Sequence, residues 1–202
     1  MRDKVKEGYD KGDYEGDYRE GREVREKERE LMESLFDGIP SESKILDLGC
    51  GTGLPFDRFL VEKDHQVTGV DISEKHVEMA RENVPEADFL QGDFFENDFG
   101  ENSFDAVVSF YAIFHIPREE HFDLFKKIRE WISDEGAILI TLGPDEMDDF
   151  EGEIGGQEMV WSSYSAEKNV ELLEKAGFEI ITTYTEDYRE ETHFWVLAEP
   201  VQ

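Results

Sequence analysis

The alternation of short apolar runs with helical patterns, from Lys44 to Leu142, is the feature that most constrains the fold of this chain. Five runs have the length and composition of buried strands, and they cover residues 44–48, 66–70, 87–91, 104–109 and 137–142. Helical patterns lie between them, for example over residues 73–83 and 118–132, and a Gly-rich turn follows the first run. Strands that alternate with helices form a mostly parallel sheet covered on both faces.

The last part of the chain departs from this alternation. Ser165 is placed to cap a helix that ends at Gly177, and two further strands, 178–184 and 193–198, follow with only a short charged connection between them. Such a connection favours an antiparallel pair. The pattern therefore predicts an α/β fold, a doubly wound Rossmann-like sheet of seven strands, mostly parallel with an antiparallel C-terminal strand, and helices on both faces.

Two parts of the chain are expected to lie outside this regular core. Residues 1–37 are interpreted as an N-terminal arm followed by a helix, because the Gly-Asp-Tyr tandem at 12–19 is too polar and Gly-rich to form a stable helix alone. Residues 38–202 form the main domain. Within it, residues 143–160 carry Gly, Pro and seven acids, so we expect an exposed insertion there.

The charge and the single cysteine exclude several classes of protein. Lys plus Arg number 21 and Asp plus Glu 51, which gives a formal charge of −30. Binding to nucleic acid is therefore not expected, since phosphate contacts need clustered cations. Cys50 has no partner for an internal disulfide. The longest apolar run, 106–114, is far shorter than the ~20 residues that span a bilayer, so we expect a soluble cytoplasmic protein with no membrane partner.

The strongest motif is the glycine-rich turn after the first strand, in Ile45-Leu46-Asp47-Leu48-Gly49-Cys50-Gly51-Thr52-Gly53. Glycines let a backbone bend sharply and approach a ligand, and the next helix points its N–H groups at that ligand. About twenty residues later, Asp71 ends the second strand, where a carboxylate can accept from both hydroxyls of a ribose. A dinucleotide fingerprint would need glycine at position 54, which is Leu54 here.

The G-x-G-x-G spacing, with Asp47 two residues before the first glycine, resembles motif I of the class I S-adenosylmethionine-dependent methyltransferases. The resemblance covers about residues 38–199. It implies S-adenosylmethionine as cofactor, with S-adenosylhomocysteine as product. A small-molecule acceptor is expected because the chain is short and shows no appended recognition domain. One departure is the sequence 134–137, Asp-Glu-Gly-Ala, where the family often has Pro-Gly-Gly.

Carried over by position, the resemblance implies a set of cofactor-binding residues. The glycine turn forms the floor under the methionine part, Asp71 holds the ribose, and Ile72 packs against the adenine. Asp93 would accept from the adenine amino group and Ser109 would lie beside the sulfonium. The complete implied set is Asp47, Gly49, Cys50, Gly51, Gly53, Asp71, Ile72, Asp93, Phe94 and Ser109.

For several residues the sequence leaves a structural interpretation beside the functional one. His115 follows the fourth strand and is either a general base or a polar residue that orients the loop before Pro117. Cys50 is interpreted as a small buried side chain rather than a nucleophile. The arm is either a disordered tail or a lid over the cofactor. The residues expected around an acceptor are Tyr14, Tyr18, Tyr111, His115, Trp161 and Tyr164, the last two alternatively in an additional edge strand.

The other four histidines, His65, His76, His121 and His193, show no metal-ligand spacing and are interpreted as surface or strand residues, so no metal is expected. The function expected is methyl transfer by in-line displacement. A protein or RNA methyltransferase and a non-catalytic S-adenosylmethionine-binding module remain alternatives, and the sequence leaves both a monomer and a homodimer open.

A charge of −30 is typical of proteins that work in concentrated salt, so we expect a halophilic protein whose fold depends on screening of this charge. Raising KCl from about 0.1 M to about 2 M should raise the melting temperature by several degrees, measured by circular dichroism. A melting temperature that does not change over this range would contradict the expectation.

Overall fold

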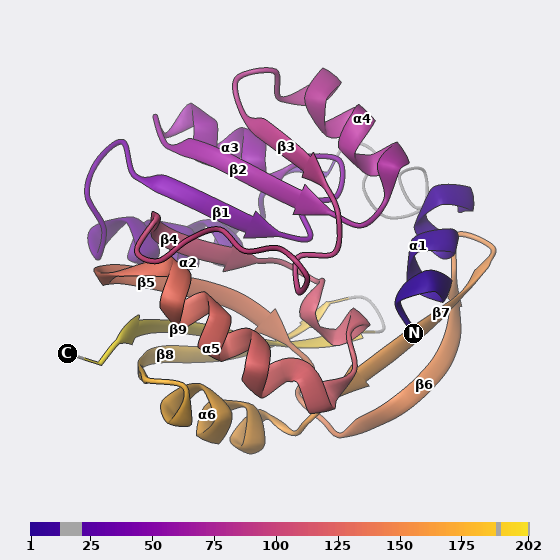
Figure 1. Cartoon of the computed structure of the whole chain (residues 1–202). Coiled ribbons are helices and arrows are strands. Elements are labelled where there is room, and N and C mark those ends of the chain that lie inside the picture. The colour runs from indigo at the N-terminus through magenta and orange to yellow at the C-terminus, as the bar shows by residue number, and fades with distance from the viewer. Residues whose placement is uncertain (13–21, 189–190, 202) are drawn as a thin grey trace.

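The computed structural model of the chain describes residues 1–12, 22–188 and 191–201, and its core is a seven-stranded sheet (Figure 1). The strand order is β3-β2-β1-β4-β5-β9-β8, and β9 is the strand that runs antiparallel to its neighbours. The predicted α/β class and sheet are thereby confirmed. The strands are β1 (Lys44–Leu48), β2 (Gln66–Asp71), β3 (Asp88–Gln91), β4 (Phe104–Ser109), β5 (Ile132–Leu142), β8 (Phe178–Tyr188) and β9 (Glu191–Pro200).

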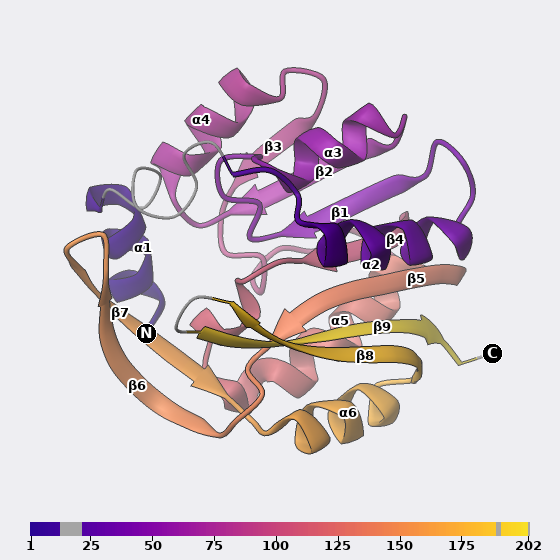
Figure 2. The same cartoon turned by 180° about the vertical axis from the view of Figure 1, so that it is seen from behind.

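Helices cover both faces of the sheet (Figure 2). The helices α2 (Glu26–Asp37) and α3 (Phe56–Glu62) pack on one face, and α5 (His121–Trp131) and α6 (Ala166–Lys175) on the other. The helix α4 (Glu74–Asn83), capped by Ser73, packs beside β2 and β3. Successive strand residues alternate between the two cores because the side-chain period of a strand is two. The order of the strands reverses between β1 and β4, so the carboxyl ends of β1, β2, β3 and β4 form one edge where a ligand can bind.

Some boundaries differ from the prediction. The helix expected over 118–132 is a 3-10 turn, Arg118–Glu120, followed by α5, and β5 begins at Ile132 rather than at 137. A register shift between β4 and β5 accommodates the extra residues of that strand. Residues 134–136, which precede the expected strand, are therefore part of β5.

The segment 143–160 was expected to be an exposed insertion, and this expectation is wrong in part. It forms most of a two-stranded sheet of β6 (Met147–Ile154) and β7 (Gln157–Ser163), which we call the β6–β7 hairpin. Met159 and Val160 are buried, because β7 packs against the N-terminal helix α1 (Arg2–Lys11) and against the 3-10 turn Ile113–His115. Most of the exposed acids of the segment, Asp148, Asp149, Glu151 and Glu153, lie on β6.

The N-terminal residues were expected to form an arm, and the structure places a helix, α1, over Arg2–Lys11. Intrinsic propensity does not explain this helix. Val5 and Gly8 are buried, and Gly8 lies so close to β7 that a Cβ there would meet the Met159 sulfur at 2.3 Å. Tertiary packing therefore stabilises α1.

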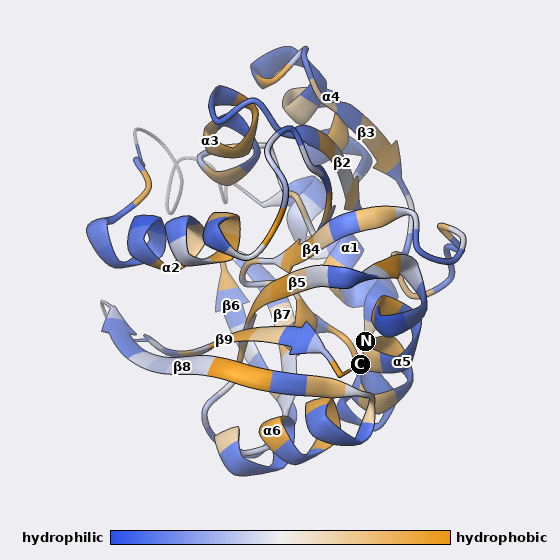
Figure 3. Cartoon of the chain, turned by 90° about the vertical axis from the view of Figure 1, so that its left-hand side faces the viewer, coloured by the Kyte–Doolittle hydropathy of each residue, from blue (hydrophilic) through white to orange (hydrophobic). Residues whose placement is uncertain are grey.

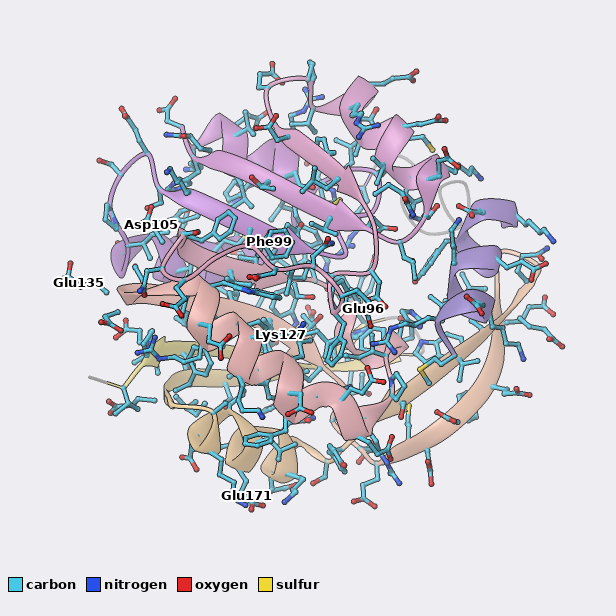
Figure 4. All side chains as sticks on the ribbon, in the orientation of Figure 1. Glu96, Phe99, Asp105, Lys127, Glu135 and Glu171 are labelled. Carbon is cyan, nitrogen blue, oxygen red and sulfur yellow. The ribbon has the colours of Figure 1, made fainter. Side chains whose placement is uncertain are left out.

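Most charged side chains lie outside these cores. Figure 3 shows hydrophilic residues on the outer faces of α2 and α4 and hydrophobic ones in the central strands. In Figure 4, Glu135 and Glu171 point away from the molecule, as do many other carboxylates. Within the described residues, no helix is long and apolar enough to cross a membrane.

One pair of carboxyl groups lies inside the fold. Asp57 in the first turn of α3 is fully buried, and Asp47 of β1, only 2% exposed, is its neighbour. Burial raises the pKa of Asp57 well above its ordinary value, and the charge of Asp47 and a hydrogen bond to it raise it further. The Asp57 carboxyl therefore keeps its proton to a higher pH in the folded chain than in the unfolded chain.

The variant Asp57→Asn should be more stable than the wild type at pH 8. At pH 5 the difference in stability between the two proteins should be smaller. A folded-state pKa above the unfolded value gives stability that is complete at low pH and is lost as the pH rises. The amide keeps the size and a hydrogen-bond donor but never ionises. The gain in melting temperature should be about 2–4 °C larger at pH 8. The exposed Asp37→Asn is the control, and a gain that does not depend on pH would contradict the assignment.

Candidate functional site

The glycine turn after β1 has the backbone geometry that only glycine adopts easily. Gly49, Gly51 and Gly53 have φ values of +84°, +57° and +76°. A Cβ on Gly49 would also come within 2.2 Å of the Ala112 Cβ, whereas one on Gly51 would meet no atom within 4 Å. Gly51 therefore borders open space, where a ligand can contact the backbone.

Asp71 connects the turn to the next strand and helix. Its Oδ2 accepts from the Gly51 N–H and its Oδ1 from the Ser73 N–H, both at 2.9 Å. The Nδ1 atom of His76 lies 3.8 Å from Oδ1. Asp71 is 7% exposed at the end of β2, so its carboxylate lies at the edge of the sheet with lone pairs left for a ligand.

A cavity of about 70 Å³, here called the glycine-turn cavity, lies at this edge. It brings together six of the predicted cofactor-binding residues with residues of α1 and of the segment after β4. Its lining is Arg2, Val5, Tyr9, Gly49, Gly51, Asp71, Ile72, His76, Asp93, Phe94, Phe110, Tyr111, Ala112, His115 and Ile116.

Four predicted cofactor-binding residues do not line this cavity. Asp47 lies below the turn beside Asp57, and Gly53 packs against α4 and β3. The Ser109 hydroxyl points back into the sheet, where it donates to the Leu48 carbonyl at 2.7 Å. Cys50 is buried, and burial followed by the charges of Asp57, Asp71 and Asp47 raises the pKa of its thiol well above the ordinary value, as suits a packing residue.

A second cavity of about 400 Å³, the hairpin cavity, adjoins the first. Its walls come from the β6–β7 hairpin, from the segment after β4 and from the start of β9. The lining is Tyr9, Arg22, Tyr111, Phe114, His115, Gly143, Met147, Phe150, Gly152, Glu153, Ile154, Trp161, Tyr188, Glu191, Thr192 and His193. Tyr9, Tyr111 and His115 line both cavities, so they mark the boundary where two bound molecules would meet.

His115 at this boundary has a defined tautomer. Its Nδ1 lies 2.9 Å from the Val160 carbonyl oxygen, which can only accept, so Nδ1 carries the hydrogen. Burial lowers the pKa of His115 to about 4, so the ring is neutral at neutral pH. Its Nε2 therefore has a free electron pair, which accepts from the Tyr9 hydroxyl at 2.9 Å.

Tyr111 contributes its ring rather than its hydroxyl. The hydroxyl donates to Glu28 Oε1 at 2.7 Å and accepts from Arg25 at the same distance. Burial, and then the charge of Glu28, raise the pKa of Tyr111 far above its ordinary value. The residue has φ +63°, a sparsely populated conformation for a side chain of this size. This network fixes the aromatic wall between the cavities.

The remaining residues expected around an acceptor divide into three groups. Trp161 lies in the hairpin cavity with its ring 5.5 Å from that of His115. The structure places Tyr164 away from the cavity lining, against His121 and under the Arg118 guanidinium. Tyr14 and Tyr18 lie outside the described residues.

The interpretation of the other histidines as surface or strand residues is confirmed for His193, which lies in β9, and is wrong for His65, His76 and His121, which are buried outside the strands. His76 lines the glycine-turn cavity and His193 the hairpin cavity. His121 is fully buried at the start of α5, and burial lowers its pKa to about 4. The polarity of a histidine ring alone does not predict that these four side chains are buried.

Sequence reasoning missed Arg2, Val5 and Asp57. The spacing of Val5 and Tyr9, four residues apart, is a helical signal, but the charge and glycines around it obscured the pattern. The hairpin residues Phe150 and Ile154 were also missed, since nothing in the order of the chain shows that β6 folds over the segment after β4.

Comparison with known proteins supports the resemblance of the glycine turn. Residues 45–136 match the family model described as methyltransferase domain. A Bacillus subtilis protein named as a methyltransferase, YqeM, is 27% identical over 169 residues, which are 77% of this chain and 67% of the relative. The 27-O-demethylrifamycin SV methyltransferase of Amycolatopsis mediterranei is 33% identical over 106 residues, which are 48% of this chain and 39% of the relative. The chain thus spans about two thirds or less of these curated relatives.

Solved structures share the fold. A SAM-dependent methyltransferase from Methanosarcina mazei superposes with a TM-score of 0.75 at 17% identity, covering 89% of this chain and 99% of that one. Magnesium protoporphyrin IX methyltransferase from Synechocystis, solved with bound SAM, gives a TM-score of 0.66 at 21% identity, covering 85% and 77%. The family model thus matches somewhat less than half of the chain, and the solved structures show that the seven-stranded sheet has the fold of known S-adenosylmethionine-dependent methyltransferases.

Proposed function

We propose that the chain transfers the methyl group of S-adenosylmethionine to a small molecule held in the hairpin cavity. The observation that carries the proposal is the pair of adjoining cavities that share Tyr9, Tyr111 and His115. One cavity has the residues for a nucleoside and the other has aromatic walls. A transfer between two bound molecules needs such a shared boundary.

The residues of the glycine-turn cavity fit the adenosyl group. Gly51 offers backbone beside open space, and the Asp71 carboxylate stands where the ribose hydroxyls would donate. Ile72 and Phe94 supply apolar surface for an adenine ring, and Asp93 supplies an acceptor for its amino group. We assign the same roles to these residues as the resemblance implies.

Bound S-adenosylmethionine would supply a methyl group on a positively charged sulfur, which needs no further activation. The protein then has to hold the acceptor in line with that methyl group. Holding two reactants about 3–3.5 Å apart in the right direction can remove roughly 7–11 kcal/mol of a barrier. Tyr111, fixed by its contacts with Glu28 and Arg25, is suited to this positioning.

His115 is suited to take a proton from an acceptor hydroxyl. Its Nδ1–H is held by the Val160 carbonyl, so Nε2 presents an electron pair at the boundary of the cavities. The low pKa of the ring keeps that pair free of a proton at neutral pH. An oxygen acceptor would thus lose its proton to Nε2 as its oxygen bonds to the methyl carbon, while the bond from that carbon to sulfur would break and S-adenosylhomocysteine would leave.

The hairpin cavity favours an acceptor with a flat apolar body. Phe114, Phe150, Trp161 and Tyr188 contribute rings, and the volume of about 400 Å³ lies in the range of small-molecule sites. Whole folded proteins or RNA duplexes do not enter a space of this size. We therefore favour a small-molecule acceptor over a protein or RNA acceptor.

The variant Asp71→Asn should bind S-adenosylhomocysteine about ten- to a hundredfold more weakly than the wild type, because it loses charge-assisted hydrogen bonds to the ribose. Titration calorimetry measures the affinity, and a melting curve checks the fold, since Asp71 also holds Gly51 and Ser73. Asp88→Asn, an exposed acid of β3, is the matched control. Equal affinity in Asp71→Asn would remove the ribose assignment.

The variant His115→Gln should lower methyl transfer by about 10²- to 10⁴-fold while its affinity for S-adenosylhomocysteine stays within about threefold of the wild type. Transfer is measured with labelled S-adenosylmethionine and a whole extract of the source cells, which is afterwards separated into small-molecule, protein and RNA fractions, and mass spectrometry identifies the product. His65→Gln, a buried histidine against Phe36, is the control.

Three results would separate the alternatives. Label that appears in protein or RNA fractions would favour the macromolecular methyltransferase. Binding of S-adenosylhomocysteine with no transfer to any fraction would favour the binding module. Full transfer by His115→Gln would show that the acceptor needs no base from this residue.

A further inference from the structure

The helix α1 stands apart from the helices that cover the sheet. It lies beside the β6–β7 hairpin at the edge where the strands end (Figures 1 and 2). Lys4 pairs with Glu151 at 2.9 Å and with Glu158 at 3.2 Å, and Asp10 accepts from the Ser73 hydroxyl at 2.7 Å. These contacts hold α1 between the hairpin and the start of α4.

Two side chains of α1 bind residues that the proposed function assigns to the ligands. Arg2 binds Asp93, assigned to the adenine, and Tyr9 binds His115, assigned to the acceptor. The Arg2 guanidinium forms an ion pair through Nε with Asp93, the acid assigned to the adenine amino group. Its other nitrogens donate to the two carboxylate oxygens of Glu120. About two turns further along α1, the Tyr9 hydroxyl donates a hydrogen bond to Nε2 of His115.

The space left in this arrangement is too small for the cofactor. The glycine-turn cavity measures about 70 Å³, whereas sites for drug-sized ligands measure about 300–1,000 Å³. Arg2, Val5 and Tyr9 form the part of its lining that comes from α1. The glycine turn and the strand ends belong to the sheet, so α1 is the wall that can withdraw.

We infer that α1 is an autoinhibitory latch, in which Arg2 competes with the adenine for Asp93 and Tyr9 competes with the acceptor for His115. This inference rests on the proposed function. A guanidinium on a carboxylate is a charge-assisted contact, and the neutral amino group of adenine must displace it. Entry of the cofactor therefore withdraws α1, and the same movement releases Nε2 of His115 for the acceptor.

If Arg2 competes with the cofactor, its removal should raise the affinity for S-adenosylhomocysteine. If α1 were a lid that contacts the bound cofactor, the same change should lower that affinity. In titration calorimetry, Arg2→Gln should bind S-adenosylhomocysteine about three- to tenfold more tightly than the wild type, because the competitor has lost its charge. Lys11→Gln removes a charge from the same helix, and since Lys11 pairs with Glu7 of α1, its affinity should equal that of the wild type. Equal or weaker binding by Arg2→Gln would overturn the latch.

Hydrogen exchange of the wild type provides a second measurement that does not depend on a variant. On addition of S-adenosylhomocysteine, exchange in the peptide 1–12 should become faster, because α1 leaves its contacts with Asp93 and the hairpin. Slower exchange would mean that α1 closes over the ligand, and would overturn the latch while leaving the proposed function intact. If neither the wild type nor Arg2→Gln binds this ligand, the proposed function falls, and the latch with it.

Discussion

The carboxylate of Asp71 is the contact on which the site depends. By accepting from the Gly51 and Ser73 N–H groups it holds together the turn after β1, the end of β2 and the entry to α4. Within the turn, position 49 does not easily accept a residue with a side chain, because Gly49 has a positive φ and lies against Ala112. The rigid edge that results gives a ligand both backbone and a carboxylate at a fixed separation, before any flexible element of the site is considered.

The second half of the site has a different physical origin. The hairpin cavity is built by β6 and β7, which lie outside the main sheet, and by rings that reach it from the segment after β4 and from β9. Its connection with the first half is the pair of Tyr9 and His115, whose hydrogen bond crosses from α1 to the segment after β4. A chemistry that joins two bound molecules therefore depends on where α1 stands.

The regular part of the fold could be predicted because its signals are local. The strands predicted over 44–48 and 104–109 have the same bounds in the structure. Ser73 and Ser165 cap α4 and α6, as the sequence predicts. The glycine turn and Asp71 were also found, since spacing along the chain places both at the carboxyl edge of a parallel sheet.

Other parts depend on contacts between distant segments, which no local pattern reports. The helix α1 forms because Val5 and Gly8 pack on β7, and the pairing of Arg2 with Asp93 joins residues far apart in the sequence. Ser109 has the expected position in β4, but its hydroxyl turns to the Leu48 carbonyl because that buried oxygen accepts it. Tyr164 likewise turns to His121 rather than to the cavity.

A side-by-side titration of the wild-type chain with S-adenosylhomocysteine and with NAD tests the central claim most directly. Both ligands carry an adenosine, but a dinucleotide needs the third glycine that Leu54 replaces. The account predicts that S-adenosylhomocysteine raises the melting temperature with increasing concentration and that NAD leaves it unchanged. Stabilisation by NAD with no response to S-adenosylhomocysteine would contradict it.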